Sequence, residues 1–97
     1  GVRFRSDRMA YAYVMGSSFV VAKAYRDDEQ AARCRSKLYR IARTGKLREQ
    51  YAVCEAFAEC GVIDDVAMLA SVLENAEADA RVAAAFALLR IERRVHP

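Results

Sequence analysis

The sequence has no tryptophan, one proline and four glycines among its 97 residues. With so few residues that break regular structure, and 55% hydrophobic residues rich in alanine, the composition favours helices and argues against disorder. No apolar run approaches the roughly 20 residues that cross a bilayer, and the N-terminus lacks a signal-peptide pattern. We therefore expect one soluble, cytoplasmic, all-α domain over residues 1–97, with no membrane partner.

The residues that could carry chemistry are few and badly spaced for it. Cys34, Cys54 and Cys60 form no CxxC motif, and the single histidine, His96, lies in the predicted tail, so a metal site is not expected. We expect the three thiols to be reduced and to lie in or beside the core. Capping explains most of the carboxylates, which stand at predicted helix starts: Asp27, Asp28, Asp64, Asp65 and Asp79. We predict no catalytic or cofactor-binding residue and no enzyme activity.

A repeat organises the chain from about residue 28 onward. Residues 50–60, QYAVCEAFAEC, and residues 81–91, RVAAAFALLRI, are two versions of one helical segment offset by 31 positions (81 − 50). The first unit, residues 28–61, is predicted to hold helices at about 28–43 and 48–60, and the second unit, residues 62–97, helices from about 64 to 74 and from about 79. Gly45 and Gly61 follow the first unit's helices, where left-handed C-terminal residues are expected.

Residues 1–27 are less regular and read as divergent N-terminal helices. We favour two helices, at about 6–15 and 19–26, separated by Gly16-Ser17-Ser18, with Ser6 capping the first and a serine capping the second. One long helix is the alternative, with Gly16 inside it at a cost of about 1 kcal/mol relative to alanine. Most of the five tyrosines are expected to pack in the core or at its boundary: Tyr11, Tyr13, Tyr25, Tyr39 and Tyr51.

Residues 64–91, DDVAMLASVLENAEADARVAAAFALLRI, resemble a HEAT repeat. They share its aspartate-led first helix with spaced leucines, its acidic turn, and a second helix with an arginine, paired alanines and a final isoleucine. The 31-residue period is shorter than the usual ~40 to 47 and is similar to that of the compact HEAT-like subclass of phycobilin lyase subunits. Gln50 stands where the second unit has Arg81. The resemblance implies an α-α superhelix, a HEAT-like solenoid of five or six helices; an ordinary alanine-rich bundle is the alternative.

The charge is unevenly distributed along the chain. Residues 1–50 carry 12 basic and 5 acidic side chains and residues 51–97 carry 4 and 8, so the two halves carry +7 and −4. At 100° per residue, one face of the helix at 28–43 carries a basic ridge: Arg33, Lys37, Arg40 and Arg43. Such a ridge suits phosphate backbones, so a nucleic-acid-associated protein is the alternative function.

The last helix has two apolar stripes. Ala84, Leu88 and Ile91 form the predicted inward stripe, and a second stripe lies nearly opposite: Val82, Phe86 and Leu89. A terminal solenoid unit normally presents a polar outer face, so the tail covers this stripe, or a following unit has been removed, or the stripe docks a partner or another copy. We favour the last two, because residues 92–97 offer only Val95 as a large apolar group. The predicted function is a non-enzymatic protein-interaction module or small scaffold.

Overall fold

The N-terminal third forms one helix. In the computed structural model, which describes the backbone of residues 2–97 and the side chains of residues 7–97, α1 spans Val2–Ala24 without interruption. The break predicted at Gly16 is therefore wrong, and Ser6 lies inside the helix instead of capping its start. Gly16 lies against α3 (Leu47–Cys60), where an added Cβ would be 3.3 Å from the Cβ of Ala56. The close approach of the two helices offsets the poor helix propensity of glycine.

The other helices agree with the predicted ranges to within a few residues. No strand occurs among residues 2–97, so the described fold is all-α, with five α-helices and one short 3-10 helix. After α1, the elements in chain order are α2 (Asp28–Thr44), α3 (Leu47–Cys60), η1 (Ile63–Asp65), α4 (Val66–Asn75) and α5 (Ala78–Val95).

The turn between α1 and α2 has a left-handed residue that is not glycine. Arg26 has φ 57°, and the N–H groups of Arg26 and Asp27 donate to the carbonyls of Lys23 at 3.2 Å and Ala22 at 2.8 Å. These two bonds form a Schellman motif at the end of α1. The carboxylate of Asp27 then accepts the N–H of Gln30 at 3.1 Å, so the chain reverses and starts α2 within three residues.

The glycines that end the first unit's helices are not left-handed. Gly45 has φ −78° and Gly61 has φ −62°, which corrects the prediction made for both. Each ends its helix by donating its N–H to a carbonyl four residues earlier, on Ile41 and Phe57, at 2.7 Å in both cases. At Gly61 an added Cβ would lie 2.8 Å from Cδ1 of Ile91, so the missing side chain allows α5 to pack closely there.

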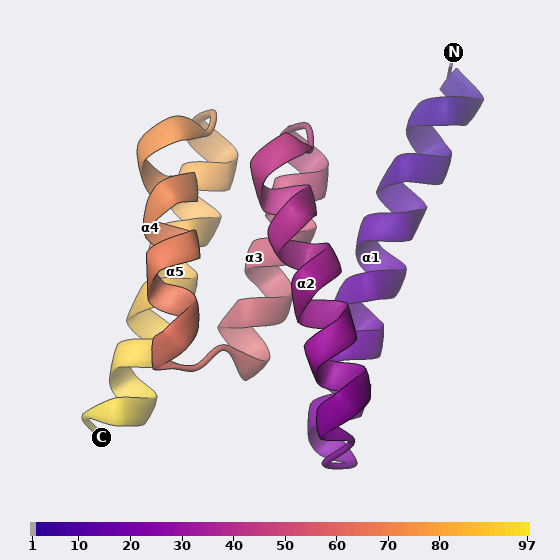
Figure 1. Ribbon diagram of the computed structural model, residues 1–97. Coiled ribbons are helices and arrows are strands. Elements are labelled where there is room, and N and C mark those ends of the chain that lie inside the picture. The colour runs from indigo at the N-terminus through magenta and orange to yellow at the C-terminus, as the bar shows by residue number, and fades with distance from the viewer. Residues whose placement is uncertain (1) are drawn as a thin grey trace.

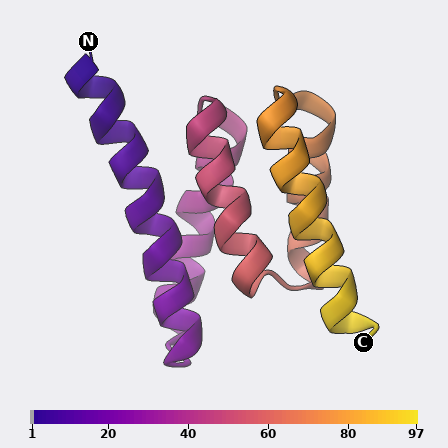
Figure 2. The same ribbon diagram turned by 180° about the vertical axis from the view of Figure 1, so that it is seen from behind.

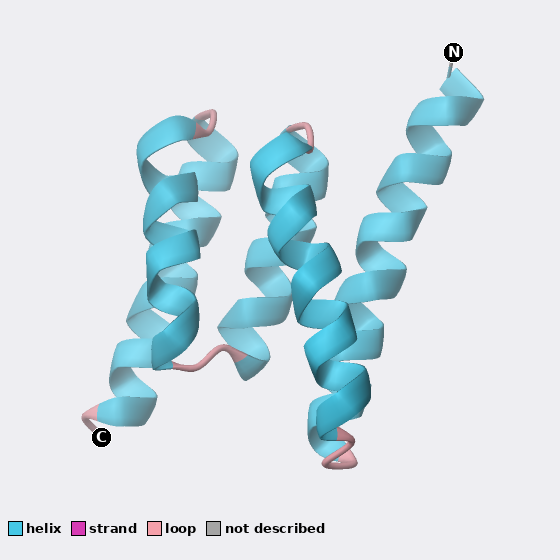
Figure 3. Cartoon of the chain, in the orientation of Figure 1, coloured by secondary structure: helices cyan, strands magenta, loops and turns pink. Residues whose placement is uncertain are grey.

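The five helices form two layers. Figure 2 shows α1, α3 and α5 side by side, with α3 between the other two, and Figure 1 shows α2 and α4 in front of them. The colouring of Figure 3 shows that short loops connect the helices. The α1–α3–α5 layer therefore has two ends, one formed by α1 and the other by α5.

The two helical hairpins, α2–α3 and α4–α5, make equivalent hydrogen bonds. Nε2 of Gln50 donates to the carbonyl of Ala42 at 3.1 Å, and Nε of Arg81 donates to the carbonyl of Leu73 at 3.0 Å. Donors and acceptors are both 31 residues apart (81 − 50 and 73 − 42), so glutamine and arginine make the same bond in their units. Backbone bonds at both turns recur with the same offset: Gly45 to Ile41 and Ala76 to Val72, and Gln50 to Lys46 and Arg81 to Glu77.

The core lies between the two layers and is built from small side chains around a few large ones. Phe19 of α1 and Phe57 of α3 are fully buried, with ring centroids 5.1 Å apart. The remaining fully buried large apolar side chains come from α2, α3, α4 and α5: Leu38, Val53, Leu69 and Ile91. The thiols of Cys34 and Cys54 are buried with them. Alanines fill most other core positions, which lets the helices pack closely.

Candidate protein-docking surface

The second apolar stripe of α5 is exposed. Val82 is 69% exposed, Phe86 58% and Leu89 57%, so the prediction that these three side chains face away from the core is correct. The inward face of the same helix is buried, at Ala80, Ala84, Ala87 and Ile91, while Leu88 is only partly buried. An 18-residue helix with apolar groups on both faces presents surface that water solvates poorly.

The stripe continues onto α3. Val82 and Phe86 line a groove of about 250 Å³ whose other wall is formed by α3, through Tyr51, Cys54, Glu55 and Ala58. The guanidinium of Arg90 lies 6.0 Å from the centre of the Phe86 ring, within the range of a cation–π contact. The candidate docking surface therefore lies on the α1–α3–α5 layer and combines an apolar centre with charged residues at its edge, Arg90 and Glu55.

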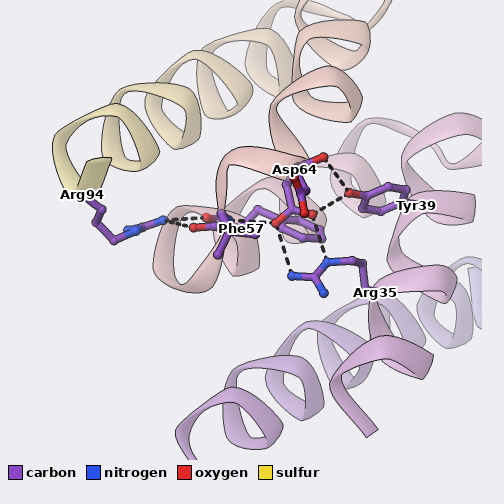
Figure 4. A network of polar contacts seen from close by, with 8 residues as sticks. Arg35, Tyr39, Phe57, Asp64 and Arg94 are labelled. Carbon is purple, nitrogen blue, oxygen red and sulfur yellow. Dashed lines mark hydrogen bonds and ion pairs between the residues drawn. The ribbon is translucent and has the colours of Figure 1, made fainter. Parts of the chain in front are cut away.

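The C-terminal tail does not cover the stripe. The α5 helix continues to Val95, which is itself 45% exposed, so only His96 and Pro97 follow it in this chain. Arg94 is held against α3, because its guanidinium donates to the carbonyls of Ala58 at 2.8 Å and Gly61 at 2.9 Å. Figure 4 shows this arginine reaching the end of α3, where it also donates to the carbonyl of Phe57 at 3.3 Å. The tail hypothesis is therefore wrong for this structure.

A buried polar network, which the sequence analysis missed, joins the two hairpins. Asp65 is fully buried; Nε of Arg35 donates to its Oδ1 at 3.0 Å, the hydroxyl of Tyr39 donates to the same oxygen at 2.5 Å, and the N–H of Val62 donates to Oδ2 at 2.9 Å. Figure 4 shows this network between α2 and the start of α4. Arg35 also stacks over the Phe19 ring, 5.1 Å from its centre. The network thus connects α1, α2 and η1.

The network of Asp65, Arg35 and Tyr39 stabilises the fold. Burial is the main reason why the pKa of Tyr39 rises from 10.0 to about 12, and the hydrogen bond to Asp65 raises it further. Each oxygen of the carboxylate has a donor, as a buried charge requires. The sequence predicted that Asp65 caps a helix. Its side chain does accept the N–H of Val62 at the start of η1, as in a capping box, but no backbone N–H of α4 bonds to it, and its ion pair with Arg35 was not predicted. The available signal was that Arg35 lies off the basic ridge on the helical wheel, close to the apolar face of α2.

The basic ridge lies on α2, in the layer formed by α2 and α4. All four of its residues are exposed on α2: Arg33, Lys37, Arg40 and Arg43. Arg33 forms an ion pair with Glu29 at 3.1 Å, whereas the other three make no ion pair with any described residue. The structure therefore brings the ridge residues together on one helix face, separate from the α5 stripe.

The remaining candidate residues are the three cysteines and the five tyrosines. Cys34 and Cys54 are buried and Cys60 is partly exposed; burial raises the pKa of Cys54 to about 12 and that of Cys60 above its usual value. Among residues 7–97, no three side chains of metal-ligating type come together. Tyr39 packs against the core, and three other tyrosines keep more than half of their surface buried: Tyr11, Tyr13 and Tyr51. The prediction of core or boundary packing is wrong for Tyr25, which is 81% exposed.

Comparison with known proteins adds no relative. No family model matches the sequence, and no curated protein and no solved structure shows significant similarity to it. In the part of the chain that the structure describes, no helix combines the length and apolar character needed to cross a membrane.

Proposed function

We propose that this chain is a HEAT-like protein-interaction module, an α-α superhelix of short repeats that docks a protein through the stripe formed by Val82, Phe86 and Leu89. The equivalent hydrogen bonds of the two hairpins, 31 residues apart, support the repeat. The arrangement of α1, α3 and α5 in one layer and α2 and α4 in the other is the one expected when two-helix units stack on their neighbours.

The exposure of Phe86 carries the proposal. More than half of this aromatic side chain is open to water, although the opposite face of its helix is core. Fully burying a side chain of this kind is worth about 1.5–3 kcal/mol, so covering the exposed half of all three residues offers about 3 kcal/mol. Aromatic side chains with this setting are typical anchors of protein interfaces.

The test compares three versions of the protein as immobilised baits: the unchanged chain, Phe86→Glu, and Ile63→Glu as a control. Ile63 is 62% exposed on η1 and does not line the groove beside Phe86, so the control introduces the same charge at another exposed apolar position. We expect Phe86→Glu to lose a partner protein or self-association that the control retains, with the same circular dichroism spectrum. If a folded Phe86→Glu protein keeps every partner and the same oligomeric state, the proposal is wrong.

A second function, nucleic-acid binding through the basic ridge, is favoured by Lys37, Arg40 and Arg43, which share an exposed face and make no described ion pair. Clustered cations bind phosphate backbones by releasing counterions, so retention on DNA or RNA should weaken steeply as salt rises. Measuring retention at two salt concentrations tests this function, and absence of binding at the lower salt concentration removes it.

A further inference from the structure

The α1 end of the α1–α3–α5 layer carries a second exposed apolar surface. Residues 9–22 contain no charged side chain, although the core takes only one side of this segment. On the opposite side, Val14 is 55% exposed and Val21 54%, and Tyr25 follows at 81%. The chain therefore exposes apolar side chains on both α1 and α5. Figure 2 shows that these two helices lie at opposite ends of the same layer.

The two surfaces differ in shape. The α1 surface is hollowed, because Val14, Val21 and Tyr25 line an open groove of about 640 Å³ between α1 and the start of α2. The groove is wide and open, so a large apolar side chain from another molecule can lie against its apolar lining. The α5 stripe provides Phe86 and Leu89, both more than half exposed. One end of the molecule thus has a groove that the side chains of the other end are able to fill.

Each surface carries a charge that can pair with the other. Among the described residues, Asp27 is the one charged residue that lines the α1 groove, and Arg90 lies beside Phe86 on α5, although Glu55 of α3 also lines the groove next to Phe86. Over the whole chain, residues 1–50 carry +7 and residues 51–97 carry −4, so the N-terminal half of one molecule attracts the C-terminal half of another. The overall charge favours a head-to-tail contact, and Arg90 offers Asp27 a local partner.

We infer that the α5 stripe docks a second copy of this chain, whose α1 groove receives Phe86 and Leu89 while Arg90 faces Asp27. The contact joins two different surfaces, so each added copy leaves one groove and one stripe unused and growth continues head to tail. In each contact α1 of one copy extends the layer beyond α5 of the other. This inference rests on the proposed function, because it names the partner of the same stripe.

The experiment blocks each surface separately. Phe86→Glu removes the stripe, Val21→Glu fills the groove with charge, and Ile63→Glu controls for a charge placed elsewhere. We expect light scattering to give a mass that grows with concentration for the unchanged chain and for Ile63→Glu, and 10.9 kDa for each blocked variant. An equimolar mixture of the two blocked variants has one intact groove and one intact stripe, so it should form a capped pair of about 22 kDa, twice 10.9 kDa.

The outcomes separate this inference from the proposed function. Val14→Glu serves as the groove variant if circular dichroism shows that Val21→Glu does not fold. If Phe86→Glu abolishes self-association and neither groove variant does, copies meet stripe to stripe, so the inference is wrong and docking through α5 stands. If the unchanged chain is monomeric at every concentration, the inference is wrong whatever else binds the stripe. If no partner of any kind depends on Phe86, both proposals are wrong.

Discussion

Replacing Asp65 by alanine tests whether the buried network holds the two hairpins together. The substitution removes the acceptor of three donors, on Arg35, Tyr39 and Val62. Removing one partner of a buried ion pair costs about 3–5 kcal/mol, because the other charge stays desolvated. The Arg35 side chain is 27% exposed and regains some water, so we expect a loss near the lower limit, about 3 kcal/mol. A domain of this size has about 5–15 kcal/mol of stability in total, so the loss is large.

The assay is urea unfolding followed by far-UV circular dichroism. The neighbouring, exposed Asp64 provides the control, because Asp64→Ala should change stability by less than about 0.5 kcal/mol. Arg35→Met, alone and combined with Asp65→Ala, completes a double-mutant cycle whose coupling energy should reach about 1–3 kcal/mol. A loss below about 1 kcal/mol for Asp65→Ala, or losses that simply add in the double variant, would refute the reasoning.

Three further predictions follow from the backbone and the buried ionisable groups. Gly16→Val should lower the free energy of unfolding by about 1–3 kcal/mol in thermal melts, because the space beside Ala56 is already filled; an unchanged melting temperature contradicts the close helix contact. Arg26→Gly should raise the free energy of unfolding by about 1 kcal/mol, because φ 57° strains any residue with a Cβ. Arg26→Ala keeps a Cβ and should not raise the free energy of unfolding. Stability should fall between pH 9 and 12, because the pKa values of Cys54 and Tyr39 are raised from 9.0 and 10.0 to about 12, so the unfolded chain releases these protons first. The stabilisation from these two raised pKa values is fully present below pH 9. Cys54→Ala should therefore reduce the loss of stability that begins near pH 9, and an unchanged slope of stability against pH contradicts the role given to Cys54.

Local patterns predicted most of the helices. The ranges expected for α2, α3, α4 and α5 agree with the structure because helical periodicity and helix starts are encoded within a few residues. The prediction failed at Gly16-Ser17-Ser18, where the local signal indicates a break. There the contact of Gly16 with α3, more than thirty residues away, favours a continuous helix, and no local rule contains that contact.

Single glycine and aspartate residues also show that local sequence rules do not contain long-range contacts. Gly45 and Gly61 were expected to be left-handed, but the left-handed turn belongs to Arg26, because the chain must reverse tightly between α1 and α2. Asp65 was expected to cap a helix, and only the packing of η1 against α2 revealed Arg35 as its partner, 30 residues away. Capping and ion pairing use the same carboxylate, so its role depends on which donors the fold brings to it.

By itself, the sequence determined that the chain is helical, that residues 50–60 and 81–91 are similar segments offset by 31 positions, and that Val82, Phe86 and Leu89 form a stripe apart from the core. These conclusions follow from composition and periodicity. Only the tertiary structure decided that the tail leaves this stripe exposed, that Asp65 joins the hairpins, and that α1 carries a groove at the other end of the layer. These features depend on the positions of whole helices relative to one another, and those positions result from packing between residues distant in sequence.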